Sequence, residues 1–86
     1  MDRAQLAQLL QQAEDRVRQG EEHIRRQQRI IAELECDAHD SSMARQLLAT
    51  FEDIQALHVA GRDRLIRALA EYDHRTSAET KNKAET

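Results

Sequence analysis

The sequence predicts an all-α fold: an antiparallel two-helix hairpin, packed like a coiled coil, with residues 1–73 as its single domain. Three observations lead to this prediction. The 86-residue chain has 34% charged and 2% aromatic residues and no proline, a helix-rich composition. Apolar and small residues recur at alternating steps of four and three, which is the spacing of a heptad seam. That spacing is interrupted once, between Cys36 and Ser42.

The first helix is expected over about residues 3–37. Its seam contains Leu6, Leu10, Ala13, Val17, Gly20, Ile24, Gln27, Ile31, Leu34 and Ala38. Gln27 is the polar member of this series. A helix of this length extends about 50 Å at a rise of 1.5 Å per residue.

A turn is expected at about residues 38–41, followed by a second helix over about residues 42–73. Asp40, Ser41 and Ser42 have short polar side chains that accept hydrogen bonds from the free N–H groups of a helix start. The second seam contains Ala44, Leu47, Phe51, Ile54, His58, Gly61, Leu65, Ala68 and Tyr72. Residues 74–86 show no apolar period, and we expect them to form a disordered tail.

The short turn requires the two helices to be antiparallel, so that the numbers of facing residues have a nearly constant sum. With the turn centred between residues 40 and 41, Gly20 is expected opposite Gly61, and Gln27 opposite Ile54. The two glycines of the chain then face each other. This register predicts a close approach of the two backbones at that level.

One flank of the predicted hairpin is more apolar than a two-helix seam can bury. The candidate interaction residues on it are His23, Ile30, Met43, Thr50 and Leu57. Small single cores rarely provide more than about 3–5 kcal/mol of stability, so we expect a second copy to cover this flank. The expected assembly is a symmetric homodimer that forms a four-helix bundle.

His23 and His58 fall at the same level of this hairpin and are candidate pH-sensitive residues. The plainer interpretation is that each histidine packs its ring edge in or beside the seam. Zinc usually needs three or four protein ligands, and no cysteine or further histidine falls at that level. We therefore predict no metal site and no cofactor.

Catalysis is not predicted. The pair His39-Asp40 superficially resembles a metal-binding pair of some phosphohydrolases, but a two-helix hairpin offers no pocket for the further ligands, and we interpret it as a turn histidine and a helix cap. Cys36, the one thiol of the chain, lacks the concave site and positioned base that nucleophilic catalysis needs. The chain is expected not to be an enzyme.

A basic segment in the first helix, Arg25 to Arg29, with Arg16 and Arg18 nearby, raises the question of nucleic-acid binding. Acidic residues four positions away can pair with most of these arginines, namely Glu14, Glu21, Glu22 and Glu33. No aromatic residue is interleaved for base stacking, and the net charge of the chain is −3. These features disfavour a nucleic-acid partner.

The chain shows neither a secretory signal nor an apolar run long enough to cross a membrane, and its single cysteine excludes an intramolecular disulfide. These features predict a cytoplasmic protein without a membrane partner.

Residues 20–69 resemble a family of short, uncharacterised proteobacterial proteins with no assigned activity, substrate or cofactor. The shared features are Glu22-His23-Ile24, His39-Asp40, Ala44 with Leu47-Leu48, Phe51, His58 and the run Arg62 to Leu65. Ala38 stands where the family pattern favours glycine. We therefore expect the first helix to end through Ala38 or His39 without a left-handed cap of the glycine type.

Two functions are consistent with these features. The first is a homo-oligomeric protein-interaction module with a regulatory or adaptor role and an unidentified protein partner. The alternative is a nucleic-acid-associated regulator that uses the arginines of the first helix, and salt-dependent binding of labelled DNA or RNA separates the two.

Overall fold

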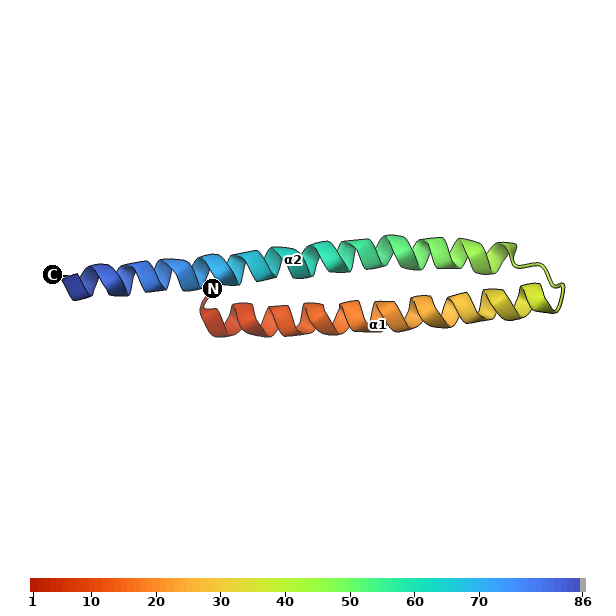
Figure 1. The fold of residues 1–86 in the computed structure, drawn as a ribbon, viewed down its shortest axis with the longest axis horizontal. Helices are drawn as coiled ribbons and strands as arrows, with labels where there is room; N and C mark the ends of the chain where they lie inside the picture. The colour runs from red at the N-terminus through yellow and green to blue at the C-terminus, as the bar shows by residue number, and fades with distance from the viewer. Residues whose placement is uncertain (86) are drawn as a thin grey trace.

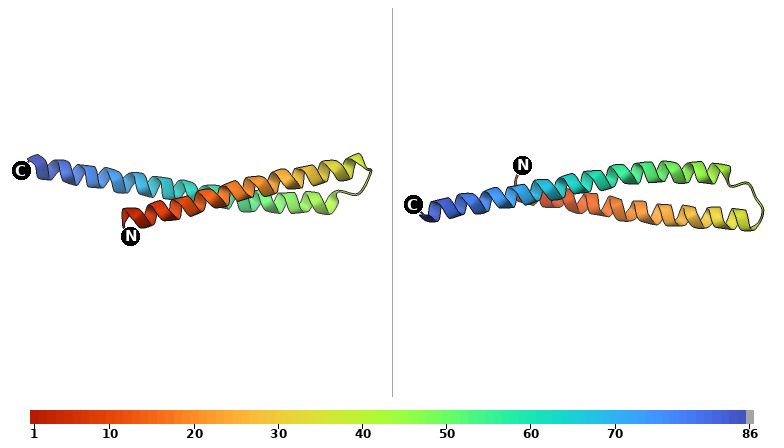
Figure 2. Two further views of the ribbon diagram at one scale, coloured as in Figure 1. Left: turned by 90° about the horizontal axis from the view of Figure 1, so that it is seen from below. Right: turned by 45° about the horizontal axis from the view of Figure 1, so that its top comes forward.

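The structure, a computed structural model, describes the backbone of residues 1–85 and the side chains of residues 1–76. Over this range the chain forms two helices and no strand: α1 (Arg3–Cys36) and α2 (Ser42–Glu85), which run antiparallel side by side (Figure 1). The predicted all-α pair of packed helices is confirmed. The rod measures 75 × 17 × 15 Å, and the two helices cross in a view from the side (Figure 2).

Helix α1 begins at Arg3 because Asp2 caps it. The Asp2 carboxylate accepts a hydrogen bond from the backbone N–H of Gln5 at 2.8 Å, and the Gln5 side chain accepts one from the backbone N–H of Asp2 at 3.0 Å. Arg3 then donates from Nε to Asp73 of α2 at 2.8 Å. The N-terminal end of the hairpin is therefore held by both a local cap and a cross-helix ion pair.

Helix α1 ends in a left-handed turn at Ala38, with φ of 58°. The N–H of His39 donates to the carbonyl of Leu34 at 2.8 Å, and the N–H of Ala38 donates to that of Glu35 at 3.2 Å. This is the Schellman pattern, in which two carbonyls at the helix end gain donors. The expectation that alanine prevents such a cap was wrong, because these two hydrogen bonds offset the strain of the left-handed residue.

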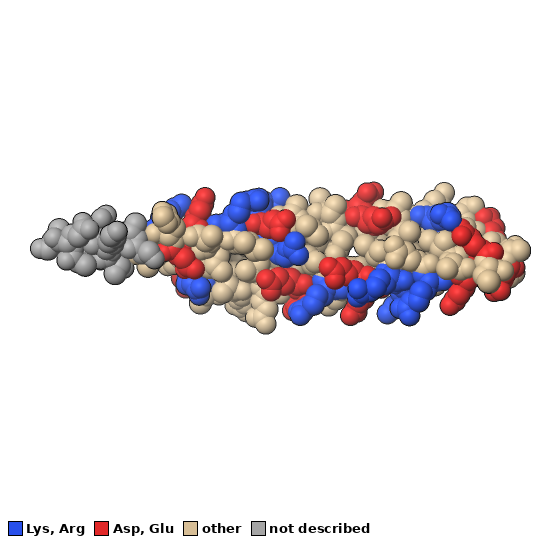
Figure 3. Space-filling view, in the orientation of Figure 1, with Lys and Arg blue, Asp and Glu red and all other residues tan. Residues whose placement is uncertain are grey.

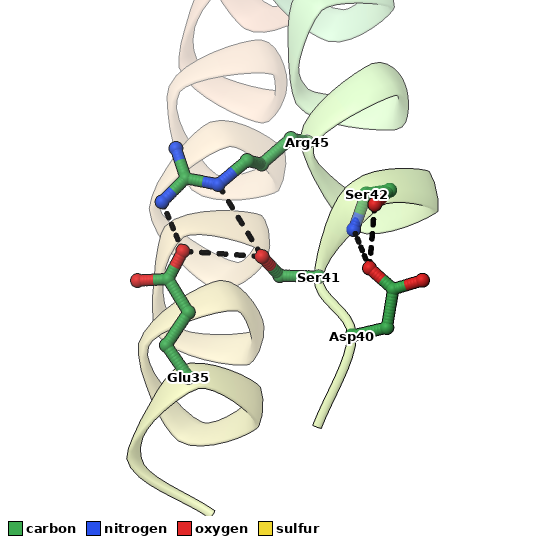
Figure 4. A network of polar contacts seen from close by, with 5 residues as sticks. All are labelled: Glu35, Asp40, Ser41, Ser42 and Arg45. Carbon is green, nitrogen blue, oxygen red and sulfur yellow. Dashed lines mark hydrogen bonds and ion pairs between the residues drawn. The ribbon is translucent and has the colours of Figure 1, made fainter. Parts of the chain in front are cut away.

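Helix α2 begins in a polar network at the turn (Figure 4). Asp40 accepts hydrogen bonds from the backbone N–H of Ser42 at 2.9 Å and from its hydroxyl at 2.5 Å, as predicted for a residue before a helix start. Glu35 of α1 accepts a hydrogen bond from Ser41 at 3.1 Å and forms an ion pair with Arg45. The last turn of α1 is thereby tied to the first turn of α2.

Helix α2 continues to Glu85, beyond residue 73, where the predicted helix ends and the predicted disordered tail begins. Residues 74–85 contain neither proline nor glycine, and alanine, glutamate and lysine are favourable in a helix. Apolar periodicity stops near Tyr72, but nothing in the local sequence breaks the helix. Thr86 lies outside the described residues.

The interface between the helices contains few fully buried side chains. Ala13, Val17, Ile31 and the polar Gln27 are each 7% exposed or less. Gln27 donates from Nε2 to the carbonyl of Ala44 at 2.9 Å. From the other helix, Gln55 donates from Nε2 to the carbonyl of Val17 at 2.8 Å. Each glutamine therefore reaches across to the backbone of the opposite helix.

The predicted register was wrong. A Cβ added to Gly20 collides with the side chain of Gln55, not with Gly61, and the ring of His23 lies 5.8 Å from that of Phe51. A Cβ added to Gly61 meets no backbone atom of α1 within 4 Å. Residues of α1 therefore face α2 residues that come about seven positions earlier than expected. A heptad seam matches itself after such a shift, so periodicity alone cannot select the register.

Candidate interaction surface

The surface with the clearest functional character is a row of exposed apolar side chains on α2. Met43 is 82% exposed, Leu47 44%, Ile54 43% and Leu57 72%. Their spacing of four, seven and three residues places them on one face of the helix. We call these four residues the apolar strip. Thr50, exposed and spaced to lie on the same face, bonds its hydroxyl to the carbonyl of Gln46 at 3.2 Å.

The structure leaves each predicted interaction residue at the surface. Met43, Thr50 and Leu57 belong to one face of α2, while Ile30, 38% exposed, and the exposed His23 come from α1. The ring of His23 lies beside the ring of Phe51 on α2. The structure therefore joins the α2 members into one row and places His23 beside it.

Two members of the apolar strip were missed as surface residues. Leu47 and Ile54 were expected in the seam, whereas their neighbours Leu48 and Gln55 take the inward positions and are only partly exposed. The sequence contains a signal for this rotation, since Leu47-Leu48 is an apolar doublet that fits two seams one residue apart. The inward position of Gln55 could not be predicted from apolar spacing, because Gln55 is polar. Its hydrogen bond to the carbonyl of Val17 holds it there.

A groove runs beside the apolar strip, between α1 and α2. It consists of two hollows of about 420 and 230 Å³, which share Arg16 and His58 as lining residues. The larger hollow is bounded by Ala13, Leu57 and Gly61 and the smaller one by Ile54. The groove is therefore mainly apolar, and its polar lining consists of arginine, histidine and glutamine side chains.

The two candidate pH-sensitive histidines both line the smaller hollow, but not at the common level that was predicted, since His23 lies against Phe51, seven residues before His58. The ring of His23 is tilted by 34° against that of Phe51. Nδ1 of His58 is buried without a hydrogen-bond partner among the described residues. A polar atom in this state is suited to a partner that supplies a donor or acceptor.

Metal binding has no support in the described part of the chain, where no three His, Cys, Asp or Glu side chains gather in a way that could hold an ion. Cys36 is exposed at the end of α1. None of the helices in the described region is both apolar enough and long enough to cross a bilayer.

Basic side chains gather along α1 in the view of Figure 3. Arg18 pairs with Asp15, not with Glu14 as expected. Arg25, Arg26 and Arg29 form no ion pair within the range whose side chains are described, so the expected pairs with Glu21, Glu22 and Glu33 are absent there. Exposed ion pairs of this type contribute little stability, which explains why they need not form.

Two carboxylates at the turn have lowered pKa values, each because of hydrogen bonds from neighbouring residues. The pKa of Glu35 lies below its ordinary value because Arg45 and Ser41 donate hydrogen bonds to its carboxylate. The pKa of Asp40 is lowered in the same way by the hydroxyl and the backbone N–H of Ser42. Glu35 ties the end of α1 to the start of α2, whereas Asp40 acts locally at the first residue of α2.

No protein-family model, curated protein or solved structure matches the chain. The resemblance of residues 20–69 to a family of short proteobacterial proteins therefore stays a prediction from sequence.

Proposed function

We propose that this chain is a non-enzymatic protein-interaction module that pairs with a second copy of itself, and that the apolar strip with Ile30 and His23 is the contact. The observation that carries the proposal is the strip itself: four large apolar side chains, 43–82% exposed, in one row. Among the residues with described side chains, only three apolar ones are buried, namely Ala13, Val17 and Ile31. If a second hairpin covers the strip, the thinly packed interfaces of the two hairpins become parts of one four-helix core.

The surface area of the chain supports the same conclusion. A compact monomer of 9.9 kDa exposes roughly 5,200 Å² by the usual scaling with mass, whereas this chain exposes 6791 Å². The excess of about 1,600 Å² exceeds the roughly 800 Å² that each partner loses in an interface of standard size. A symmetric dimer is the commonest way to cover such a surface.

We assign the module a regulatory or adaptor role, in which the polar faces of the dimer engage an unidentified protein partner. Because Cys36 is exposed and free, a reducing compartment such as the cytoplasm suits it.

The test is the mass of the full chain in solution, by sedimentation velocity or light scattering. We expect twice the 9.9 kDa of one chain at tens of micromolar. Leu57→Asp places a charge on the strip and should shift the mass to that of one chain, as should Ile30→Asp. The matched control is Ala49→Asp, which changes an exposed residue of α2 outside the strip. A wild-type protein that stays at the mass of one chain contradicts the proposal.

A second candidate function rests on the arginines of α1. Arg25, Arg26 and Arg29 lack ion pairs in the described range, which leaves their guanidinium groups available to phosphates. A gel shift of labelled DNA and RNA over a salt series tests this function, with Arg25→Gln/Arg29→Gln as the variant. Absence of binding at low salt removes the candidate.

A further inference from the structure

The apolar strip is the middle of a longer heptad row on the exposed side of α2. In steps of three and four, this row contains Asp40, Met43, Leu47, Thr50, Ile54, Leu57, Gly61 and Arg64. Only its two ends are charged, and they carry opposite charges. Asp40 and Arg64 are both exposed, and neither forms an ion pair among the residues with described side chains. Because the steps are the same when counted from either end, the heptad row can match an antiparallel copy of itself at every position.

We propose that two chains pair through the heptad row, with their α2 helices antiparallel about a twofold axis at the level of Glu52. This pairing rests on the proposed function, in which two copies meet through the apolar strip, and it adds which residues meet. Leu47 then lies opposite the partner's Leu57. Thr50, between them on the same face, lies opposite the partner's Ile54. Each of these contacts occurs twice, since a twofold axis repeats it.

Met43 and Gly61 form the outer apolar layer of the same pairing. Met43 is 82% exposed, so most of its side chain projects from the rod. Gly61 lines the hollow of about 420 Å³. A Cβ placed on Gly61 meets Nη2 of Arg64 at 3.9 Å and no atom of α1 within 4 Å. The space beside Gly61 therefore admits the flexible side chain of the partner's Met43. With this layer, every residue of the apolar strip lies against an uncharged residue of the partner.

The charged ends of the heptad row also meet in this alignment. Asp40 lies opposite the partner's Arg64 at each end, so two ion pairs enclose the apolar layers. Hydrogen bonds from Ser42 lower the pKa of Asp40, which keeps its carboxylate charged. Exposed ion pairs supply little binding energy, so their role here is to favour one direction and register. Asp53, on the outer flank, comes near its own copy, but it is exposed and the repulsion is screened by salt.

The competing alignments are less complementary. A slide of one heptad in one direction sets Leu57 against the partner's Asp40, and a slide in the other direction sets Leu47 against the partner's Arg64. Each slide therefore leaves a leucine of the strip against a charged group. A parallel pair of α2 helices covers the strip as well, but it sets Asp40 and Arg64 each against its own copy. Coverage of the strip thus selects the register, and the charged ends favour the antiparallel direction.

His23, the α1 residue at the centre of the proposed contact, lies beside the same axis. Its ring is 5.8 Å from that of Phe51, the residue directly before Glu52. A twofold axis that crosses the rod at this level places His23 of both chains near the middle of the interface. The contact therefore extends from the heptad row onto α1, as a four-helix core requires.

Cross-linking of the full chain tests the register. Gln46, Asp53 and Ala60 lie seven residues apart on the outer flank of the heptad row, and all three are exposed. Each is changed to cysteine in a Cys36→Ser background and treated with a short bis-maleimide reagent. Asp53→Cys should be joined to its copy, because the two copies lie about 3 Å apart along the rod. The copies of Gln46→Cys and Ala60→Cys lie about 18 and about 24 Å apart, and they should not be joined.

A double-mutant cycle tests the charged ends. Asp40→Asn removes the charge but keeps an oxygen for the N–H of Ser42, and Arg64→Gln removes the guanidinium. Each variant should weaken dimerisation about two- to tenfold in sedimentation, because the dimer contains two exposed pairs. The double variant should be weakened no more than either single variant, because paired charges act as one interaction. The matched control is Arg29→Gln, which removes an exposed arginine of α1 and should leave the dimer unchanged.

The outcomes separate this pairing from the proposed function. A dimer that is joined at Gln46→Cys or Ala60→Cys, or at none of the three cysteines, overturns the pairing alone. A dimer that both charge variants leave unchanged, or that they weaken additively, does the same. A wild-type chain that stays monomeric overturns the proposed function and the pairing together. Cross-linking at Asp53→Cys only, with a non-additive charge cycle, supports the pairing.

Discussion

Replacement of Ala38 by glycine should stabilise the hairpin, because Ala38 is held in a left-handed conformation, with φ of 58°. An L-residue in this region is disfavoured by roughly 1–2 kcal/mol, whereas glycine adopts it freely. Glycine also makes the unfolded chain more flexible, which removes about 0.4–1 kcal/mol of the gain. The net expectation for Ala38→Gly is an increase of about 0.5–1 kcal/mol in the free energy of unfolding.

The assay is urea unfolding followed by far-ultraviolet circular dichroism. All variants must be compared at one protein concentration, because self-association adds to apparent stability. The matched control is Ala49→Gly, which introduces glycine at an exposed position inside α2. That variant should lose about 1 kcal/mol, so the two substitutions should move the midpoint in opposite directions.

The two variants also define the result that refutes the reasoning. If Ala38→Gly lowers the stability as much as Ala49→Gly does, residue 38 is not left-handed in solution. The Schellman hydrogen bonds of Ala38 and His39 then do not end α1. A gain of stability in Ala38→Gly alone supports the turn described here.

Two further predictions concern the interface and the turn. Gly61→Ala should raise the free energy of unfolding by about 1 kcal/mol, because alanine favours helix more than glycine does. Gly20→Ala should gain little or nothing, because the new Cβ displaces Gln55 and breaks its hydrogen bond to the opposite helix. Thermal unfolding measures both variants, and equal effects of the two substitutions contradict the observed register. The pKa of Glu35 is lowered in the folded chain, so its contribution to stability is present above the ordinary carboxyl pKa and is lost as the pH falls through the lower folded value. Urea unfolding at a series of acidic pH values should therefore show a smaller decrease in the free energy of unfolding for Glu35→Gln than for wild type.

Much of the fold could be predicted from residue types and spacing. The interruption between Cys36 and Ser42 predicts the turn, and Asp40 takes part in the start of α2 as expected, since its short carboxylate accepts a free N–H there. The left-handed cap at Ala38 could not be predicted, because alanine rarely adopts that conformation in isolation. It forms here because two carbonyls of the last helical turn gain backbone donors.

The candidate site was predicted only in part. Met43 and Leu57 are exposed apolar residues, as expected, but Leu47 and Ile54 were assigned to the wrong face of α2. A heptad pattern tolerates a small rotation of the helix when apolar residues stand in adjacent positions. The inward position of Gln55 decides the rotation, and a buried glutamine has no signature in a pattern of apolar residues.

Residue types and their spacing are enough to predict two helices, their antiparallel order and the position of the turn, because periodicity and helix-start residues are properties of the local chain. Which residues face each other depends instead on how the two helices pack. A seam that repeats every seven residues is unchanged by a slide of seven, so apolar contact is nearly equal in several registers. The hydrogen bonds from Gln27 and Gln55 to carbonyls of the opposite helix are made in one register alone. Those two directional contacts distinguish among alignments that the hydrophobic effect leaves almost equal in energy.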